Sequence, residues 1–268
     1  MGTRDIPFVS LQAPPDLTAR IESCIKAACD RLTAAETALI YFRADDIAVP
    51  GANFLRMMEL FSNYRIPLSL AVVPAWITAQ RWKALRRPGQ RFSSLWCWHQ
   101  HGWRHANHEY AGRHQEFGPA RRQADIKDDL LKGRSRLENI IGDDFYPVFT
   151  PPWNRCNLKT LKLAGACGFL AVSRNCGASP PAPRSLPDFC VDVDLHTRTV
   201  IDPATEWSRF FAELTEYLSS GRCGIMIHHR RMNAAAFDFL EALMKILNRN
   251  ERIRCVNFKD LVETKMFG

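Results

Sequence analysis

Two adjacent carboxylates, Asp45 and Asp46, come two residues after an apolar run that ends at Phe42. Such a pair is costly to hold together unless a cation or a proton separates the two charges. The pair therefore indicates one metal ligand beside one general base. The alternative is a solvated turn whose carboxylates cap the next helix.

The histidines are concentrated downstream, since four of the eight fall between His99 and His108. His101 and His105 are four positions apart. On a helical turn they would project from one face, as two imidazole ligands of one zinc must. The spacing predicts a site for Zn²⁺ or another divalent transition metal. A polar, histidine-rich loop is the alternative.

A proline-tryptophan segment, Pro151-Pro152-Trp153-Asn154, follows the expected strand 147–150. The prolines stiffen the chain where it leaves the expected strand. Trp153 then offers a flat apolar face, and the backbone around Asn154 offers hydrogen-bond donors. The alternative is a stiffened connection with a core tryptophan.

Two more segments carry candidate groups for proton transfer. Asp192 and Asp194 lie on one face of an expected strand, where an aspartate would orient a histidine. His228 follows the apolar run 224–227 and is well placed as a general acid. The alternatives are exposed strand aspartates and an ordinary polar residue at a loop start.

Short apolar runs alternate with helix-period segments along the whole chain. Several runs are apolar on both faces, which is typical of a buried parallel sheet, and seven or eight strand–helix units favour a closed or nearly closed barrel. Asn233 is a predicted N-cap. The expected strands are 38–42, 68–73, 95–98, 147–150, 169–173, 190–193, 224–227 and 253–258, and the expected helices are 15–32, 52–63, 119–140, 157–166, 206–220 and 234–248.

In a barrel of this kind, chemistry gathers at the carboxyl ends of the strands. The candidate groups each follow a different strand, so they are expected on one face of a single domain covering residues 1–268. The Pro-rich stretch 179–187 indicates a surface loop rather than a domain boundary. No Gly-rich loop follows the first strand, so neither a dinucleotide fingerprint nor a P-loop is present.

Composition sets broader limits. The chain has 268 residues, 46% apolar and 24% charged, which excludes disordered and collagen-like architectures. The sequence contains no run of 18 apolar residues, the length that would predict a membrane span. The net charge of +8 comes without a nucleic-acid recognition motif, so no nucleic-acid partner is expected. Nine cysteines without a CxxC motif, and a start lacking an apolar signal region, indicate free thiols and a cytoplasmic protein.

From about Ile40 to His228 the order of these motifs resembles the polysaccharide deacetylases of the NodB-homology type, carbohydrate esterase family four. The resemblance implies an α/β fold, a distorted (β/α)7 barrel. The family's Thr-Phe-Asp-Asp-Gly motif is similar to Phe42-Arg43-Ala44-Asp45-Asp46. The match implies that Asp45 is the general base and Asp46 a metal ligand.

The other motifs extend the likeness. The family's His-x-x-x-His motif is matched by His101 and His105, which would complete the metal triad. The family's closing motif, an apolar strand followed by histidine, implies His228 as general acid. The resemblance implies that either Asp192 or Asp194 fills the remaining aspartate motif, and it leaves open which of the two would support His228.

Two departures concern the first and third motifs. The family's Arg-x-Pro-Trp/Tyr-Gly motif resembles Thr150–Asn154, but its arginine, which braces the base, is Thr150 here. Arg43 or Arg155 is the hypothetical replacement. The glycine after the two aspartates is Ile47.

The resemblance implies a metal-dependent hydrolase that removes an N-acyl group, an N-acetyl group above all, from an amino sugar or glycan. Trp103 and Trp153 would stack on a sugar ring, and the partner would be a small-molecule or oligosaccharide substrate. One alternative is an amidohydrolase acting on a small non-sugar amide, ureide or imide. Another is a catalytically degenerate barrel that binds a ligand. Substrate, metal and oligomeric state stay open.

Overall fold

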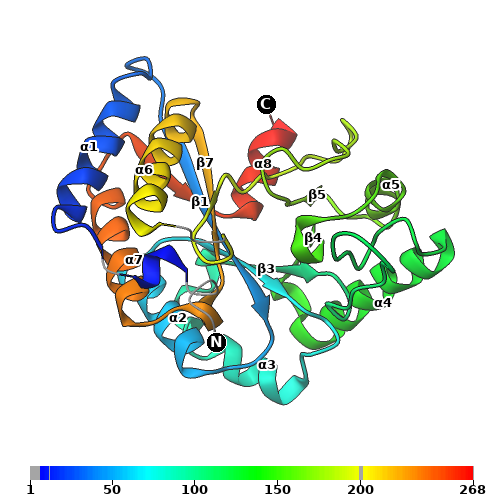
Figure 1. The fold of residues 1–268 in the computed structure, drawn as a ribbon. Helices are drawn as coiled ribbons and strands as arrows, with labels where there is room; N and C mark the ends of the chain where they lie inside the picture. The colour runs from blue at the N-terminus through cyan, green and yellow to red at the C-terminus, as the bar shows by residue number, and fades with distance from the viewer. Residues whose placement is uncertain (1–6, 12, 199–201, 268) are drawn as a thin grey trace. The chain divides into compact units, whose positions relative to one another are not determined.

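The structure, a computed structural model, describes residues 7–11, 13–198 and 202–267. In that part of the chain, eight strands are hydrogen-bonded in the order β5-β4-β3-β2-β1-β7-β6, and β8 also pairs with β1. The strands are β1 (Ala38–Ile47), β2 (Leu68–Val72), β3 (Trp96–His101), β4 (Phe145–Thr150), β5 (Ala171–Val172), β6 (Val193–Asp194), β7 (Arg222–Ile227) and β8 (Ile253–Val256) (Figure 1).

Helices connect most of these strands, as a parallel sheet requires. Among the described residues, no helix combines the length and the apolarity needed to cross a bilayer. The helices are α1 (Leu17–Cys29), α2 (Ala52–Tyr64), α3 (Ala79–Arg86), α4 (Gln123–Ile141), α5 (Leu158–Ala166), α6 (Pro203–Ser219), α7 (Ala234–Leu247) and α8 (Phe258–Phe267).

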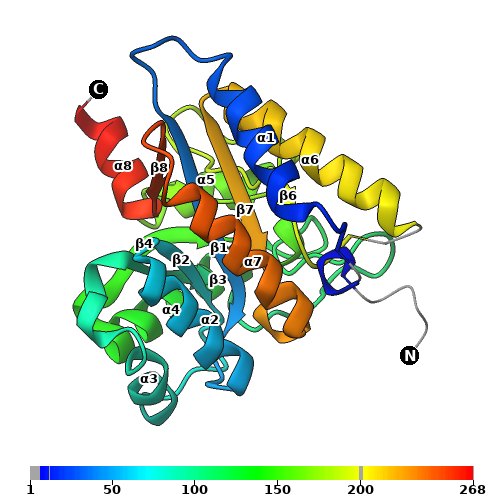
Figure 2. The same cartoon turned by 90° about the vertical axis from the view of Figure 1, so that its left-hand side faces the viewer.

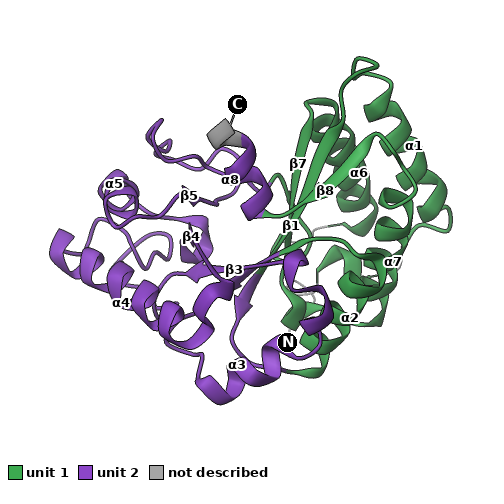
Figure 3. Ribbon diagram, turned by 180° about the vertical axis from the view of Figure 1, so that it is seen from behind, with its two compact units in different colours: residues 1–44, 51–68, 192–257 green, residues 45–50, 69–191, 258–268 purple. Residues whose placement is uncertain are grey.

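The chain divides into two compact units (Figure 3). Unit 1 holds residues 1–44, 51–68 and 192–257, and unit 2 holds residues 45–50, 69–191 and 258–268. Strand β1 passes from the first unit into the second after Ala44, so Asp45 and Asp46 belong to unit 2.

Unit 1 is built on β7, which pairs in parallel with β1 and β6. Helix α6 buries one face because its apolar side chains recur three and four positions apart. Figure 2 shows α1 running alongside α6, with which it makes extensive contact. The Trp207 ring of α6 packs edge-on against Phe8 at 5.0 Å and Phe239 at 5.2 Å. These aromatic side chains are part of the buried core of unit 1.

Unit 2 pairs β3 with β4 and β4 with β5, all in parallel. Its core includes Phe117, Phe149 and Phe169. The Phe149 ring packs edge-on against Phe117 at a centroid distance of 5.2 Å and tilted against Phe169 at 5.6 Å. Leu130 of α4 and Leu161 of α5 are fully buried against the same cluster. The β3–β4 pairing continues to His101 and Thr150, and this places both residues at the carboxyl end of the sheet.

Most expected elements are present, and Asn233 caps α7 as predicted by accepting a hydrogen bond from the Ala236 N–H at 3.0 Å. The expected strands 169–173 and 190–193 shrink to the two-residue strands β5 and β6. The segment between them makes only isolated bridges, such as Asn175 with Val191, so the ladder is not continuous. Helices α3 and α8 were not expected, and apolar burial explains both. Trp82 and Leu85 of α3 are buried, as are Phe258, Leu261 and Val262 of α8.

Candidate metal centre

Unit 2 brings together the side chains of Asp46, His101 and His105, whose ligand atoms all lie within 4.8 Å of one another. Asp46 Oδ1 is 3.4 Å from His101 Nε2 and 3.3 Å from His105 Nε2. One carboxylate oxygen and two imidazole nitrogens are a donor set that suits zinc and similar divalent metals. The residues present therefore fit the metal that the sequence predicts.

His101 is oriented for ligation by the strand beside it. Its Nδ1–H donates to the Thr150 carbonyl oxygen at 3.0 Å, since a carbonyl only accepts. The proton is thereby fixed on Nδ1, and the lone pair on Nε2 faces Asp46. The Thr150 hydroxyl lies 2.9 Å from His99 Nε2, so the residue in place of the family's arginine contacts two histidines.

His101 and His105 do not lie on a helical turn, the arrangement considered from their spacing. His101 is the last residue of β3, because its pairing with β4 continues to Thr150, and His105 lies in the loop that follows. The loop reverses through Gly102, with φ of +59°, and His105, with φ of +57°. Asp46 has a φ of +61°. Left-handed backbone at two of the three candidate ligands, Asp46 and His105, is strained, and such strain is typical of functional sites.

Sequence reasoning missed Glu116, a fully buried carboxylate. Its Oε1 accepts from the Arg104 N–H at 2.6 Å, and its Oε2 accepts from the N–H groups of Trp103 at 3.1 Å and His105 at 3.2 Å. Burial raises the pKa of Glu116, while these bonds oppose that rise. Glu116 belongs to no motif and lies 11 residues beyond His105, so no local pattern marks it.

The surroundings of His105 favour a neutral imidazole, which is the form that binds metals. Burial, and next the proximity of His101, lowers the pKa of His105. The Trp153 ring lies 4.4 Å from the His105 ring, and the Trp76 ring lies 5.7 Å from it. Two tryptophans thus form an apolar wall beside the donor cluster.

The proline-tryptophan segment turns sharply, as the expectation of a stiff loop requires. Pro152 is buried, and Trp153 and Asn154 have φ of +55° and +59°. Successive backbone bonds, from Asn154 N–H to the Pro151 carbonyl at 3.0 Å and from Arg155 N–H to the Pro152 carbonyl at 3.2 Å, hold this turn. The Trp153 indole is therefore held beside His105.

The predicted base and its predicted supporting arginine are both buried. Asp45 of unit 2 is 3% exposed. Arg43 of unit 1 is fully buried, and its Nη2 lies 3.0 Å from Met226 Sδ. The other arginine considered, Arg155, donates from Nη1 to the His114 carbonyl at 3.4 Å.

In unit 1, His228 directly follows β7, and its backbone N–H donates to His196 Nδ1 at 3.2 Å. His196 is 1% exposed and was missed by the sequence analysis. Burial, and then His228, lowers the pKa of His196 well below its usual range. Asp194 Oδ1 accepts from the His196 N–H at 2.9 Å, so this aspartate caps the loop that carries His196. Asp192 Oδ2 accepts from the Gly224 N–H at 2.7 Å.

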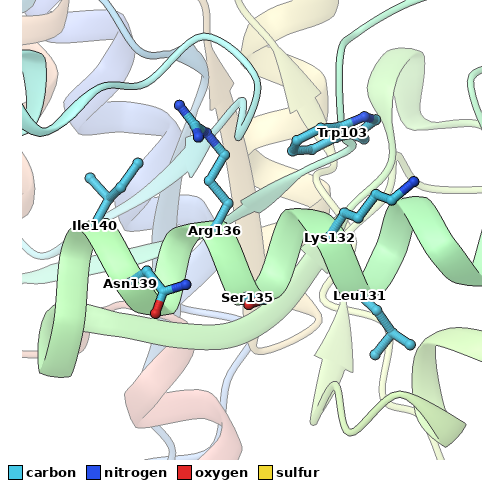
Figure 4. A pocket seen from close by; sticks show the side chains of 7 residues that line it. All are labelled: Trp103, Leu131, Lys132, Ser135, Arg136, Asn139 and Ile140. Atoms are coloured by element: carbon cyan, nitrogen blue, oxygen red, sulfur yellow. The ribbon is translucent and has the colours of Figure 1, made fainter.

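Trp103 lines a groove of about 530 Å³ along α4 in unit 2. Figure 4 shows its indole ring beside the side chains of Lys132 and Arg136, which rise from α4. Arg136 is held in place by bonds to the carbonyl oxygens of Pro74 at 2.8 Å and Ile77 at 2.7 Å. The Trp103 ring thus borders a groove, while its backbone belongs to the loop that carries His105.

No protein-family model matches the sequence, and the comparison with curated proteins finds no match. Solved structures do match. A Mycobacterium smegmatis protein assigned as a polysaccharide deacetylase superposes with a TM-score of 0.64 at 15% identity, covering 87% of this chain and 91% of that one. A family 4 acetyl xylan esterase from Clostridium thermocellum, in complex with a cobalt ion, gives 0.54 at 11% identity, covering 85% and 92%. A CE4 family pseudoenzyme from Bacillus anthracis gives 0.52 at 12% identity, covering 84% and 66%.

At these identities the likeness concerns the fold. It agrees with the parallel strand pairings found here and with the order of motifs from Asp45 to His228. The α/β fold class expected from the sequence, the NodB-type barrel, is therefore confirmed, and the chain has the fold of the polysaccharide deacetylases.

Proposed function

We propose that the protein is a metal-dependent hydrolase that removes an N-acetyl group from an amino sugar or glycan. The observation that carries the proposal is the cluster of Asp46, His101 and His105, with both histidine Nε2 atoms within 3.4 Å of one carboxylate oxygen. The acetyl xylan esterase with the same fold was solved with a cobalt ion, which supports a divalent metal in such a cluster.

Asp46, His101 and His105 would hold the metal, and Thr150 would keep His101 in the ligating tautomer. When bound, a divalent metal polarises the acyl carbonyl and lowers the pKa of water toward neutrality. His101 is buried, and Asp46 and His105 are partly buried. Electrostatic interactions with a polar acyl group are stronger in such a position than in bulk water.

Proton transfers are assigned to Asp45 and His228. Asp45 accepts a proton from a water molecule as the oxygen of that water bonds to the acyl carbon. His228 donates a proton to the amine nitrogen as the carbon–nitrogen bond breaks, so acetate and a free amine leave. The order of motifs supports both roles, as does the position of Asp45 directly before the ligand Asp46.

The substrate class is supported by the aromatic wall. Trp153 presents its indole 4.4 Å from His105, and a flat apolar ring suits the face of a sugar. The solved structures with this fold include a protein assigned as a polysaccharide deacetylase and an acetyl xylan esterase. Both names refer to acetylated carbohydrates.

The test is release of acetate from N-acetylglucosamine oligomers by protein stripped with chelator and by protein reloaded with Zn²⁺ or Co²⁺. We expect activity only after reloading, and we expect its loss in Asp45→Ala and His101→Ala. Activity that survives both substitutions would overturn the mechanism. Turnover of ureides or small N-acyl amines, without turnover of acetylated sugars, would replace the substrate class.

A non-catalytic, ligand-binding barrel is the second candidate. It is favoured by Thr150, which stands where the family has arginine and whose hydroxyl contacts His99, and by the pseudoenzyme that shares the fold. A binding protein would tolerate Asp45→Asn with unchanged ligand affinity and would release no acetate before or after the substitution.

A further inference from the structure

The loop that carries His105 is organised around one carboxylate. Three consecutive N–H groups, those of Trp103, Arg104 and His105, converge on the two oxygens of Glu116. Glu116 is fully buried, so a carboxylate there needs strong partners to offset its lost hydration. Hydrogen bonds from N–H groups to a carboxylate are roughly twice as strong as bonds between neutral groups.

This loop needs such an anchor. Between His101 and His105 the backbone passes through left-handed conformations at Gly102 and at His105 itself. A non-glycine residue in this conformation is strained, and the conformation persists only where the surroundings impose it. The bond from the His105 N–H to Glu116 acts at the strained residue itself.

Gly102 provides independent support. A Cβ at this position would overlap Glu116 Oε2 and would lie 2.6 Å from Pro152 Cγ. The missing side chain lets the carboxylate lie directly against the loop backbone. The loop and the glutamate are therefore fitted to each other, beyond the three hydrogen bonds.

Glu116 is itself held firmly by its neighbour in the chain. Phe117 is fully buried, and its carbonyl accepts from the Thr160 hydroxyl at 2.8 Å and from the Asn157 N–H at 3.2 Å. Phe117 also bridges to Cys156. The carboxylate is thus attached to the core of unit 2, and it transmits that rigidity to the loop.

We propose that Glu116 is a positioning residue that holds His105 in its ligating conformation and so sets the metal affinity without contacting the metal. The proposal rests on the proposed function only in requiring that Asp46, His101 and His105 bind a divalent ion. A partner in the outer shell of a metal site commonly changes affinity by 10- to 100-fold.

The test is Glu116→Gln, which keeps the size and removes the charge. Its amide NH₂ would face N–H donors where a carboxylate oxygen now accepts. Titration with Co²⁺, followed by visible absorption, is expected to give a Kd about 10- to 100-fold higher than that of the wild type. Amide hydrogen exchange in metal-free protein is expected to speed up at residues 103–105. The shorter variant Glu116→Asp is expected to lie between the wild type and Glu116→Gln in both the Co²⁺ affinity and the exchange rate.

The matched control is Glu109→Gln. Glu109 lies in the same connection and accepts from the Ala120 N–H at 3.2 Å, and we expect it to leave the Co²⁺ affinity unchanged. Affinities of Glu116→Gln and Glu116→Asp within twofold of the wild type would overturn the proposal, as would an equal loss in Glu109→Gln. If Glu116→Gln does not fold, Glu116→Asp decides alone. Absence of Co²⁺ binding in the wild type would instead overturn the proposed function, and exchange at 103–105 would still test the anchoring role.

Discussion

Each unit of the molecule contains buried histidines, but their surroundings differ. In unit 2, His101 and His105 face the carboxylate of Asp46 with their Nε2 atoms. In unit 1, burial lowers the pKa of His196 most, and the cationic or potentially cationic groups around it, His228, Arg231 and His229, lower it further. The first arrangement directs a carboxylate oxygen and two imidazole nitrogens toward one another, and the second surrounds one imidazole with cationic or potentially cationic groups.

This difference separates two uses of one side chain. A histidine whose lone pair faces a carboxylate and a second imidazole can ligate a divalent ion. His196 instead uses its Nδ1 lone pair to accept the His228 backbone N–H, which fixes the start of the loop after β7. Its buried neutral ring acts as a structural acceptor. Burial alone, shared by both groups, does not distinguish the two uses.

The largest effect is expected from His101→Ala combined with His105→Ala. Losing two of three donors should abolish measurable Zn²⁺ or Co²⁺ binding, a change larger than the roughly 100-fold that outer-shell losses reach. Elemental analysis after removal of excess metal measures this. His108→Ala, an exposed histidine of the same region, is the control and should keep the wild-type metal content. If the double variant kept the metal content of the wild type, His101 and His105 would not be metal ligands, and their difference from His196 would disappear.

The next effect is expected from Asp45→Asn. The amide keeps the size of the buried side chain but cannot accept a proton, so kcat for acetate release should fall by about 10²- to 10⁴-fold. The Co²⁺ affinity should stay within a few-fold of the wild type, which separates base from ligand. Loss of metal together with activity would instead assign Asp45 to the ligand set.

A substitution of His228 tests the proton donor in unit 1. His228→Gln should lower kcat on N-acetyl amines by about 10²-fold or more, because an amine leaves only with a proton. Hydrolysis of 4-nitrophenyl acetate, whose phenolate leaves unprotonated, should change much less. Equal losses on both substrates would argue against a general acid and for a purely structural His228.

The smallest effect concerns stability. Because the folded state holds the pKa of His196 well below its ordinary value of about 6.5, the unfolded chain binds more protons below that pH. Stability should therefore fall as the pH drops through about 6.5, and at pH 5.5 this one group accounts for up to about 1.4 kcal/mol. Its charged neighbours are His228, His229 and Arg231, with Asp194 accepting from its backbone N–H.

The check is urea unfolding of the wild type and His196→Asn at pH 7.5 and 5.5. Asparagine retains an acceptor for the His228 N–H but does not titrate, so the variant should lose less stability on acidification by roughly 1 kcal/mol. Identical pH dependence in both proteins would show that His196 is not the group responsible.

Local pattern was sufficient for much of the fold. Apolar runs on both faces predicted buried parallel strands, and Asn233 predicted the start of α7, because these features depend on residues close together in the chain. The boundaries were less well predicted. Strand β3 continues to His101 only because β4 lies beside it, and pairing with a neighbour has no local signature.

The sequence by itself determined which donors are present and their order: a carboxylate pair, two histidines four apart and a histidine after a buried strand. Only the tertiary structure decided how they are held. It placed His105 in a left-handed loop rather than a helix, and it placed Glu116 under that loop. The physical reason is that strain at one residue is compensated by hydrogen bonds and burial from distant segments, and these exist only once the chain has folded.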